Sequence, residues 1–265
     1  MSEDPLVSPL TALLAFGAGL VVAVVTTPVG VSGAVFLLPV QFDLLRVPSP
    51  AVTPTNLLYN VVATPGALLR HHRTGALGGP LTRRLVAGTL PGVVVGTLVR
   101  VFLAPGDRVF RVLAAALLLG IGIWLCLRIR DRPAPPRELR GPVVTGLGAV
   151  VGVVGGIYGI GGGSLLGPIL VGTGMSVATV APAALAATFL TSVAGVATYG
   201  LLSLVVDWPV GPDWITGLCC GAGGLIGGYL GARLQPRVPE TALRTLLGVL
   251  AIGLAVTYLV QAARG

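Results

Sequence analysis

The chain has 265 residues, of which 54% are hydrophobic and only 10% are charged, and its mean hydropathy is +0.94. About a quarter of the residues in a soluble domain are charged, so this composition excludes an ordinary soluble protein and indicates a membrane protein. The net charge of +8 comes from arginines that lie in short clusters between apolar runs. That distribution argues against a nucleic-acid-binding surface and is typical of the loops of a membrane protein.

Long uncharged stretches predict the membrane segments, since about 20 apolar residues cross a bilayer. A single helix over the first stretch, residues 5–42, would span about 57 Å, which is well beyond the thickness of a bilayer, so we expect a helical hairpin there. The longest stretch, 66 residues, corresponds to roughly three crossings. We therefore expect an all-α polytopic protein with eight to ten membrane segments. In chain order the stretches are 5–42, 47–69, 141–206, 214–232 and 245–263.

A charged, proline-rich stretch in mid-chain, residues 128–140, is predicted to be a cytoplasmic linker between two repeats, 1–127 and 141–265. Glycine and proline positions recur in both repeats in the same order, as in transporters with internal repeats. At an offset of 129, Gly30, Gly33 and Pro39 fall on Gly159, Gly162 and Pro168. Further along, the glycine spacing of PGVVVG (91–96) resembles that of AGGLIG (222–227).

The arginine distribution predicts the orientation, because cytoplasmic loops carry an excess of positive charge. With the linker, the 70–84 loop and the 233–244 loop inside, 12 arginines are cytoplasmic and 5 are outside. Both termini then lie outside the cell. The two repeats are inverted, each a broken-helix hairpin followed by three transmembrane helices. A prokaryotic cell membrane is the expected location.

Two glycine runs, GVSGAVFLLP (30–39) and GIGGGSLLGP (159–168), fall where the hairpins should bend. Broken backbone at membrane depth is tolerated where it is buried in protein or lines a cavity. A helix that restarts there presents unpaired N–H groups and the positive end of its dipole, which suits an anion. The alternative is close helix packing through small residues. The candidate binding residues in the runs are Gly30, Ser32, Gly33, Gly159, Gly161, Gly162, Gly163 and Ser164.

Polar residues that follow each hairpin are candidates to complete this site, because hydroxyls and amides donate hydrogen bonds to oxyanions. Helical spacing puts the members of each set on one face. Serine and threonine also bond back to their own helix, so the alternative is a purely local role. The register between the two sets stays open. The first set is Thr55, Asn56 and Tyr59, with Thr53 and Asn60 nearby, and the second is Thr188, Thr191 and Ser192, with Tyr199 nearby.

These half-signatures resemble the TauE/SafE family of sulfite exporters over residues 10–260. The matching segments are GVSGAVFLLP with PTNLLYNVVATPGA, and GIGGGSLLGP with ATFLTSVAGVATYG. The first half departs from the glycine-rich pattern, since Ser32 and Ala34 stand where the second half has Gly161 and Gly163. The resemblance implies transport of small anions, such as sulfur oxyanions or organosulfonates, across a prokaryotic cell membrane.

Energetics favours export, because the membrane potential drives an anion out of the cell, whereas import needs a coupled ion. All nine acidic residues fall in predicted termini, turns or loops. Among those near a membrane segment, Asp43 is the one worth testing for a role in coupling, and the alternative is a solvated turn residue. The expected partners are a small anionic solute and the lipid bilayer, without nucleic acid, cofactor or metal. The three cysteines lack the spacing of metal ligands. The oligomeric state stays open, with a homodimer among the options.

Three other functions are compatible with parts of the sequence. GVSG (30–33) matches a short pattern of intramembrane serine proteases, but His71 and His72 lie in a predicted cytoplasmic loop, away from Ser32. We therefore expect a protein that is not an enzyme. A passive anion channel of the same fold and a non-transporting membrane scaffold remain as alternatives.

Overall fold

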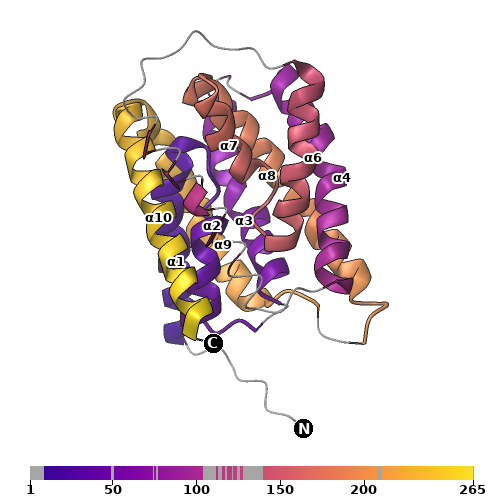
Figure 1. The fold of residues 1–265 in the computed structure, drawn as a ribbon. Coiled ribbons are helices and arrows are strands. Elements are labelled where there is room, and N and C mark those ends of the chain that lie inside the picture. Colours follow the sequence, from indigo (N-terminus) through magenta and orange to yellow (C-terminus); the bar gives the residue numbers. More distant parts are fainter. Residues whose placement is uncertain are drawn as a thin grey trace.

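In the computed structural model the described residues are 9–48, 51–73, 75, 77–103, a subset of positions between 112 and 127, 140–207 and 210–264. Helices account for the regular structure in these ranges, and Figure 1 shows most of them running along one common direction. The long helices are α1 (Pro9–Thr26), α3 (Val52–Arg73), α4 (Pro80–Phe102), α6 (Gly141–Tyr158), α8 (Val177–Leu202), α9 (Trp214–Leu234) and α10 (Glu240–Arg264). The short ones are η1 (Thr27–Val29), α2 (Ala34–Pro39), η2 (Val40–Leu44), α7 (Gly163–Gly172) and η4 (Gln235–Arg237).

Five helical segments among the described residues are long and apolar enough to cross a membrane. Their outward surfaces expose leucine and valine, for example Leu13, Val150 and Leu201, as a lipid-facing surface requires. The prediction of an all-α polytopic membrane protein is confirmed. The five segments are Pro9–Val29, Pro80–Phe102, Gly141–Tyr158, Val177–Leu202 and Trp214–Arg237.

Glycines hold α4 and α6 in backbone contact. A Cβ atom on Gly92 would lie 2.3 Å from the carbonyl oxygen of Ala149, and one on Gly96 would lie 2.1 Å from that of Val153. Because the contacting residue numbers rise together, the two helices run in parallel. Small residues at such a contact let membrane helices approach closely, and Figure 1 shows the pair side by side.

The same kind of contact joins α1 to α9. A Cβ atom on Gly223 would lie 1.9 Å from the carbonyl oxygen of Phe16, and one on Gly227 would lie 2.3 Å from that of Leu20. These helices also run in parallel. Thus the first long helix of each half packs on a helix of the other half. Figure 1 shows α1 beginning at the end of the molecule where α10 finishes, whereas α6 begins at the opposite end.

These contacts relate the glycines of the two halves differently from the match of 91–96 with 222–227. If α1 and α6 correspond at the predicted offset of 129, the contacts of Gly92 and Gly96 with Ala149 and Val153 match those of Gly227 and Gly231 with Leu20 and Val24. Which glycine of α4 corresponds to which glycine of α9 depends on the residue that each one contacts on the partner helix. The glycine spacing within α4 or α9 alone does not show those contacts. Residues 128–139 of the predicted linker lie outside the described residues, and the boundaries of the two repeats stay a prediction.

Candidate functional site

The first glycine run interrupts a helical hairpin. Helix α1 ends at Thr26, the turn η1 follows, and α2 begins at Ala34. Between them Gly30 adopts a left-handed conformation with a φ of 74°, which glycine adopts without the steric cost of a Cβ atom. We call residues 27–33 the first break.

The second glycine run interrupts the hairpin of the other half. Helix α6 ends at Tyr158 and α7 begins at Gly163, and both Gly159 and Gly161 have a φ of 71°. We call residues 159–162 the second break. Two left-handed residues within three positions turn the chain sharply, so α7 can follow α6 without a longer loop.

Each break lies against the beginning of a long helix of the other half. A Cβ atom on Gly30 would lie 2.5 Å from the Cα atom of Ala181 in α8. A Cβ atom on Gly159 would lie 2.3 Å from the carbonyl oxygen of Thr53 in α3. Neither position has room for a side chain, so the predicted glycines here serve both the turn and the close helix packing.

Polar groups from both halves meet between the breaks. The Ser32 hydroxyl of the first break donates to Oδ1 of Asn60 on α3. From the second break, the Cβ direction of Gly161 points at α8 and α3. A Cβ atom there would lie 3.0 Å from Oγ of Ser192 and 3.3 Å from Nδ2 of Asn60, and would press on the Thr188 methyl group at 2.7 Å. We call Ser32, Asn60, Gly161, Thr188 and Ser192 the central cluster.

Three polar groups of the central cluster have no hydrogen-bond partner among the described residues: Asn60 Nδ2, Thr188 Oγ1 and Ser192 Oγ. All three side chains are fully buried. Since Oδ1 of Asn60 already accepts from Ser32, its remaining amide group is a donor. Unsatisfied buried polar groups cost about 1–3 kcal/mol each, which is unusual in one place unless a ligand or water completes them.

Other predicted residues support the breaks. The Thr191 hydroxyl accepts from the backbone N–H of Gly162 at 3.1 Å, and it donates to the Ala187 carbonyl at 2.7 Å. The Asn56 amide donates to the carbonyl of Ala34 at 2.8 Å, at the start of α2. The first bond satisfies an N–H group at the start of α7, where the helix itself supplies no acceptor, and the second ties α3 to the start of α2.

The remaining predicted residues lie around the central cluster. The Ser164 hydroxyl bonds back to the Ile160 carbonyl, a local role of the kind the sequence left open. Close packing accounts for three more, since Gly33 abuts the Tyr59 hydroxyl and Gly163 abuts the Ala184 carbonyl. Thr55 lies elsewhere: its hydroxyl accepts from the backbone N–H of Asp213 at 2.8 Å and fastens α3 to the loop before α9.

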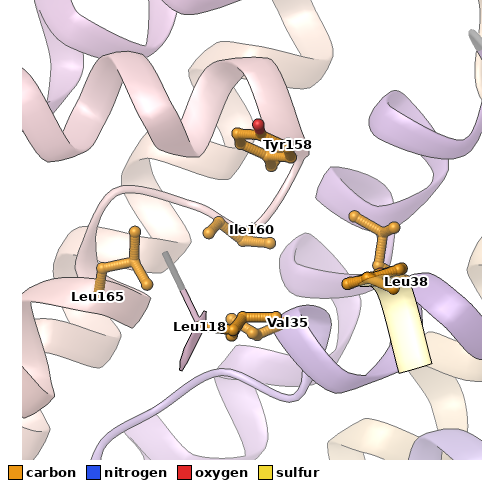
Figure 2. A pocket seen from close by; sticks show the side chains of 7 residues that line it. Val35, Leu38, Leu118, Tyr158, Ile160 and Leu165 are labelled. Atoms are coloured by element: carbon orange, nitrogen blue, oxygen red, sulfur yellow. The ribbon is translucent and has the colours of Figure 1, made fainter. Parts of the chain in front are cut away.

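A small apolar cavity borders the breaks on another side. The side chains of Val35, Leu38 and Leu165 line it, together with Leu118, Tyr158, Ile160 and Tyr258. Figure 2 shows the Tyr158 hydroxyl pointing away from Val35 and Leu118. Within the cavity, the centre of a water molecule can occupy a volume of about 20 Å³, which is room for one or two waters. Both its size and its lining make it a poor site for an oxyanion.

The described aspartates lie outside the central cluster. Asp43 and Asp207 are exposed, and Asp213 caps α9 by accepting from the Thr216 N–H at 3.0 Å. Ser32 bonds to Asn60, whereas His71 lies in the last turn of α3, about 16 Å further along that helix. The geometry therefore offers Ser32 a hydrogen-bond acceptor in place of the general base that a serine protease needs.

Two residues have a larger place in the structure than in the sequence prediction. Asn60 was noted only as a polar neighbour, yet it connects the two breaks; its spacing of four residues from Asn56 was the available signal. Arg100 is one of the five arginines that the charge distribution predicts outside the cell, in a turn over residues 100–111. It lies in the last turn of α4, and its side chain is only 3% exposed.

Comparison with known proteins gives one match. Residues 15–258 match the family model described as Sulfite exporter TauE/SafE, which covers nearly the whole chain. No curated protein and no solved structure was found to match.

Proposed function

Since the chain belongs to the sulfite exporter TauE/SafE family, we propose that it transports small anions and holds them at the central cluster. The preferred substrates are sulfur oxyanions or organosulfonates, sulfite among them. The observation that carries this proposal is the convergence of unused, buried donor groups beside Gly161. The family and the apolar helices establish a multi-pass membrane protein of a transporter family.

Hydrogen-bond chemistry favours an oxyanion over a cation at this place. The Asn60 amide can only donate once Ser32 occupies its oxygen, and the Thr188 and Ser192 hydroxyls are free to donate. An oxyanion offers several acceptor lone pairs to such a set, and hydrogen bonds to a charged group are worth about 1.5–3 kcal/mol. Neutral donors also let the anion leave, which transport requires.

The second break supports the proposal further. Helix α7 begins at Gly163, and its positive dipole end lies beside Thr188, whose Oγ1 is 2.6 Å from a Cβ atom placed on Gly163. Helix α2 spans only six residues, so its dipole contributes little. We therefore assign unequal roles to the breaks. The second supplies backbone N–H groups and dipole, and the first supplies Ser32.

The halves, residues 1–127 and 141–265, are proposed to be inverted repeats on either side of this site. Support comes from the opposite starting ends of α1 and α6, and from the matched contacts of Gly30 with Ala181 and of Gly159 with Thr53. These contacts relate α3 to α8 at an offset of 128, which makes Asn60 the counterpart of Thr188. The arginine distribution supports a cytoplasmic linker and outward termini in a prokaryotic cell membrane.

Export is the proposed direction. An inside-negative potential of 100 mV is worth about 2.3 kcal/mol per charge, which corresponds to roughly a 50-fold gradient. A monovalent anion would therefore leave the cell without a coupled ion. Among the described residues, the exposed positions of Asp43 and Asp207 give no support to a proton pathway through the central cluster.

Flux of sulfite from loaded proteoliposomes tests the proposal. Thr188→Val keeps the side-chain shape and removes a hydroxyl from the central cluster, and we expect it to reduce flux about tenfold or more. Thr198→Val on the same helix is the matched control, because the Thr198 hydroxyl donates to a carbonyl of its own helix, that of Ala194. Flux that saturates with concentration identifies a carrier, and flux that stays linear identifies a channel. Wild-type flux equal to that of empty liposomes, for every anion tested, would reject transport and favour a scaffold.

A further inference from the structure

Arg100 is a buried cation in a membrane helix. Arginines near the end of a membrane helix normally extend their side chains to water at the interface. The Arg100 side chain is instead enclosed by protein, with only 3% of its surface exposed. An ionisable residue inside a membrane protein is costly and usually marks a ligand or ion pathway.

The helix contacts place Arg100 level with the second break. Successive turns of α4 meet successive turns of α6, with Gly92 at Ala149 and Gly96 at Val153. One further turn brings Arg100 to the end of α6, where the chain turns at Gly159. This position is level with Tyr158, the last residue of α6, and the next residue of α4, Val101, packs in one apolar cluster with Tyr199 of α8.

The two tyrosines connect Arg100 with the central cluster. Tyr158 directly precedes Gly159, and its hydroxyl points away from Val35 and Leu118 in the apolar cavity (Figure 2). Tyr199 is fully buried and shares an apolar cluster with Val101, the residue after Arg100. It lies seven residues, or about 10 Å along α8, from Ser192 and on the same helix face.

The corresponding place at the first break carries no charge. On α9, Gly227 meets Leu20 and Gly231 meets Val24, and one further turn is Gln235. Gln235 belongs to η4, which contacts η1 of the first break. A neutral amide therefore occupies the position that Arg100 occupies at the second break. Packing alone does not require an arginine at one break and a glutamine at the other. A binding position for an anion on one side of the central cluster would explain the difference.

We propose that Arg100, together with the Tyr158 and Tyr199 hydroxyls, forms a second anion-binding position beside the second break. A small oxyanion occupies it between the central cluster and the end of the molecule where α4 finishes. Guanidinium is suited to this role because its planar donors match two oxygens of an oxyanion. The inference rests on the proposed anion transport. It adds a second binding position for the anion and states on which side of the central cluster that position lies.

The test uses full-length protein in proteoliposomes of known orientation, with sulfite flux measured from each side. We expect Arg100→Gln to raise KM about 10- to 100-fold for sulfite presented from the side where α4 ends, with a smaller effect from the other side. Arg100→Lys should restore part of the loss, because it keeps the charge but not the planar fork. Arg83→Gln is the control, since it removes an exposed arginine from the same helix and should leave KM unchanged.

A purely structural role for Arg100 makes a different prediction. It would lower thermal stability in Arg100→Gln and leave KM at the wild-type value from both sides, and that result would overturn the inference. If Arg100→Gln does not fold, Tyr199→Phe and Tyr158→Phe take its place. Each must raise KM for sulfite from the same side, and a wild-type KM in either variant would overturn the inference. Absence of wild-type flux would reject transport instead. Sulfite-dependent thermal stabilisation would then decide the anion position, because it must weaken in Arg100→Gln for the inference to stand.

Discussion

Ser192 and Thr191 are adjacent hydroxyl residues for which the structure predicts opposite effects. The Ser192 hydroxyl is fully buried and has no partner among the described residues. Ser192→Ala should therefore leave the unfolding free energy of the ligand-free protein unchanged or raise it, by up to about 1–3 kcal/mol. It should also remove one hydrogen bond to the bound anion, worth about 1.5–3 kcal/mol, and so raise Kd about 10- to 150-fold.

Thr191→Val should do the reverse. Valine keeps the shape of threonine but cannot accept the bond that the Gly162 N–H donates at 3.1 Å. A buried N–H without a partner costs about 1–3 kcal/mol, or several degrees in the midpoint of thermal unfolding. The direct loss of anion affinity should be smaller than in Ser192→Ala, because the Thr191 hydroxyl already bonds to Gly162 and to Ala187.

Thermal unfolding in detergent, with and without sulfite, measures both quantities for both variants. The expected pattern is a stable Ser192→Ala protein that sulfite hardly stabilises, and a less stable Thr191→Val protein that sulfite still stabilises. A Ser192→Ala protein that is less stable than wild type yet binds sulfite equally well would refute the reasoning. The hydroxyl would then be a packing element rather than part of an anion site.

Two further predictions concern contacts between neighbouring elements. Gly163→Ala puts a Cβ atom 1.8 Å from the Ala184 carbonyl oxygen and should lower the free energy of unfolding by about 1–3 kcal/mol. In the control, Gly200→Ala, the new Cβ atom meets nothing within 4 Å, so the free energy of unfolding should stay unchanged or rise. Equal stabilities of the two variants would contradict the close contact at Gly163. Thr55→Val removes the acceptor for the Asp213 N–H and should lower thermal stability while leaving KM for sulfite unchanged. A raised KM in that variant would place Thr55 at the substrate instead.

The close contacts at the second break also limit how the site can be tested. Leucine at Gly162 or Gly163 would collide with Thr89 or with the Ala184 backbone, so a loss of transport in such variants would not separate binding from folding. Removal of a hydroxyl, as in Thr188→Val or Ser192→Ala, introduces no new atoms and is the cleaner experiment.

Sequence reasoning reached the architecture because membrane helices depend on composition and glycine breaks depend on local backbone preference. Gly30 and Gly159 adopt left-handed conformations, which glycine adopts most readily, so the glycines in the sequence already indicate where the chain can turn. The partners of polar side chains are a different matter. Asn60 and Thr188 became neighbours of Gly161 through the packing of α3 against α8 and the second break, and their spacing along the chain does not encode that distance.

Arg100 shows the same limit for charge. The sequence predicts Arg100 in the turn over residues 100–111, because the side chain of an arginine at a helix end is normally exposed. Helix α4 continues to Phe102, and the neighbouring helices enclose the side chain. Only the contacts of α4 with α6 place it at the second break.

The exchange of helices between halves has a consequence for how the protein is made. Helix α1 finds its glycine-lined partner on α9, near the other end of the chain, and α4 finds its partner on α6. At about 5–20 residues per second, α1 would wait about 10 to 40 s for α9 to leave the ribosome. During that interval the α1 face that will meet α9 and the small-residue face of α4 are open to lipid and to other membrane proteins. The first half therefore enters the membrane before it can fold, and it completes its packing only when α6 and α9 of the second half have been made.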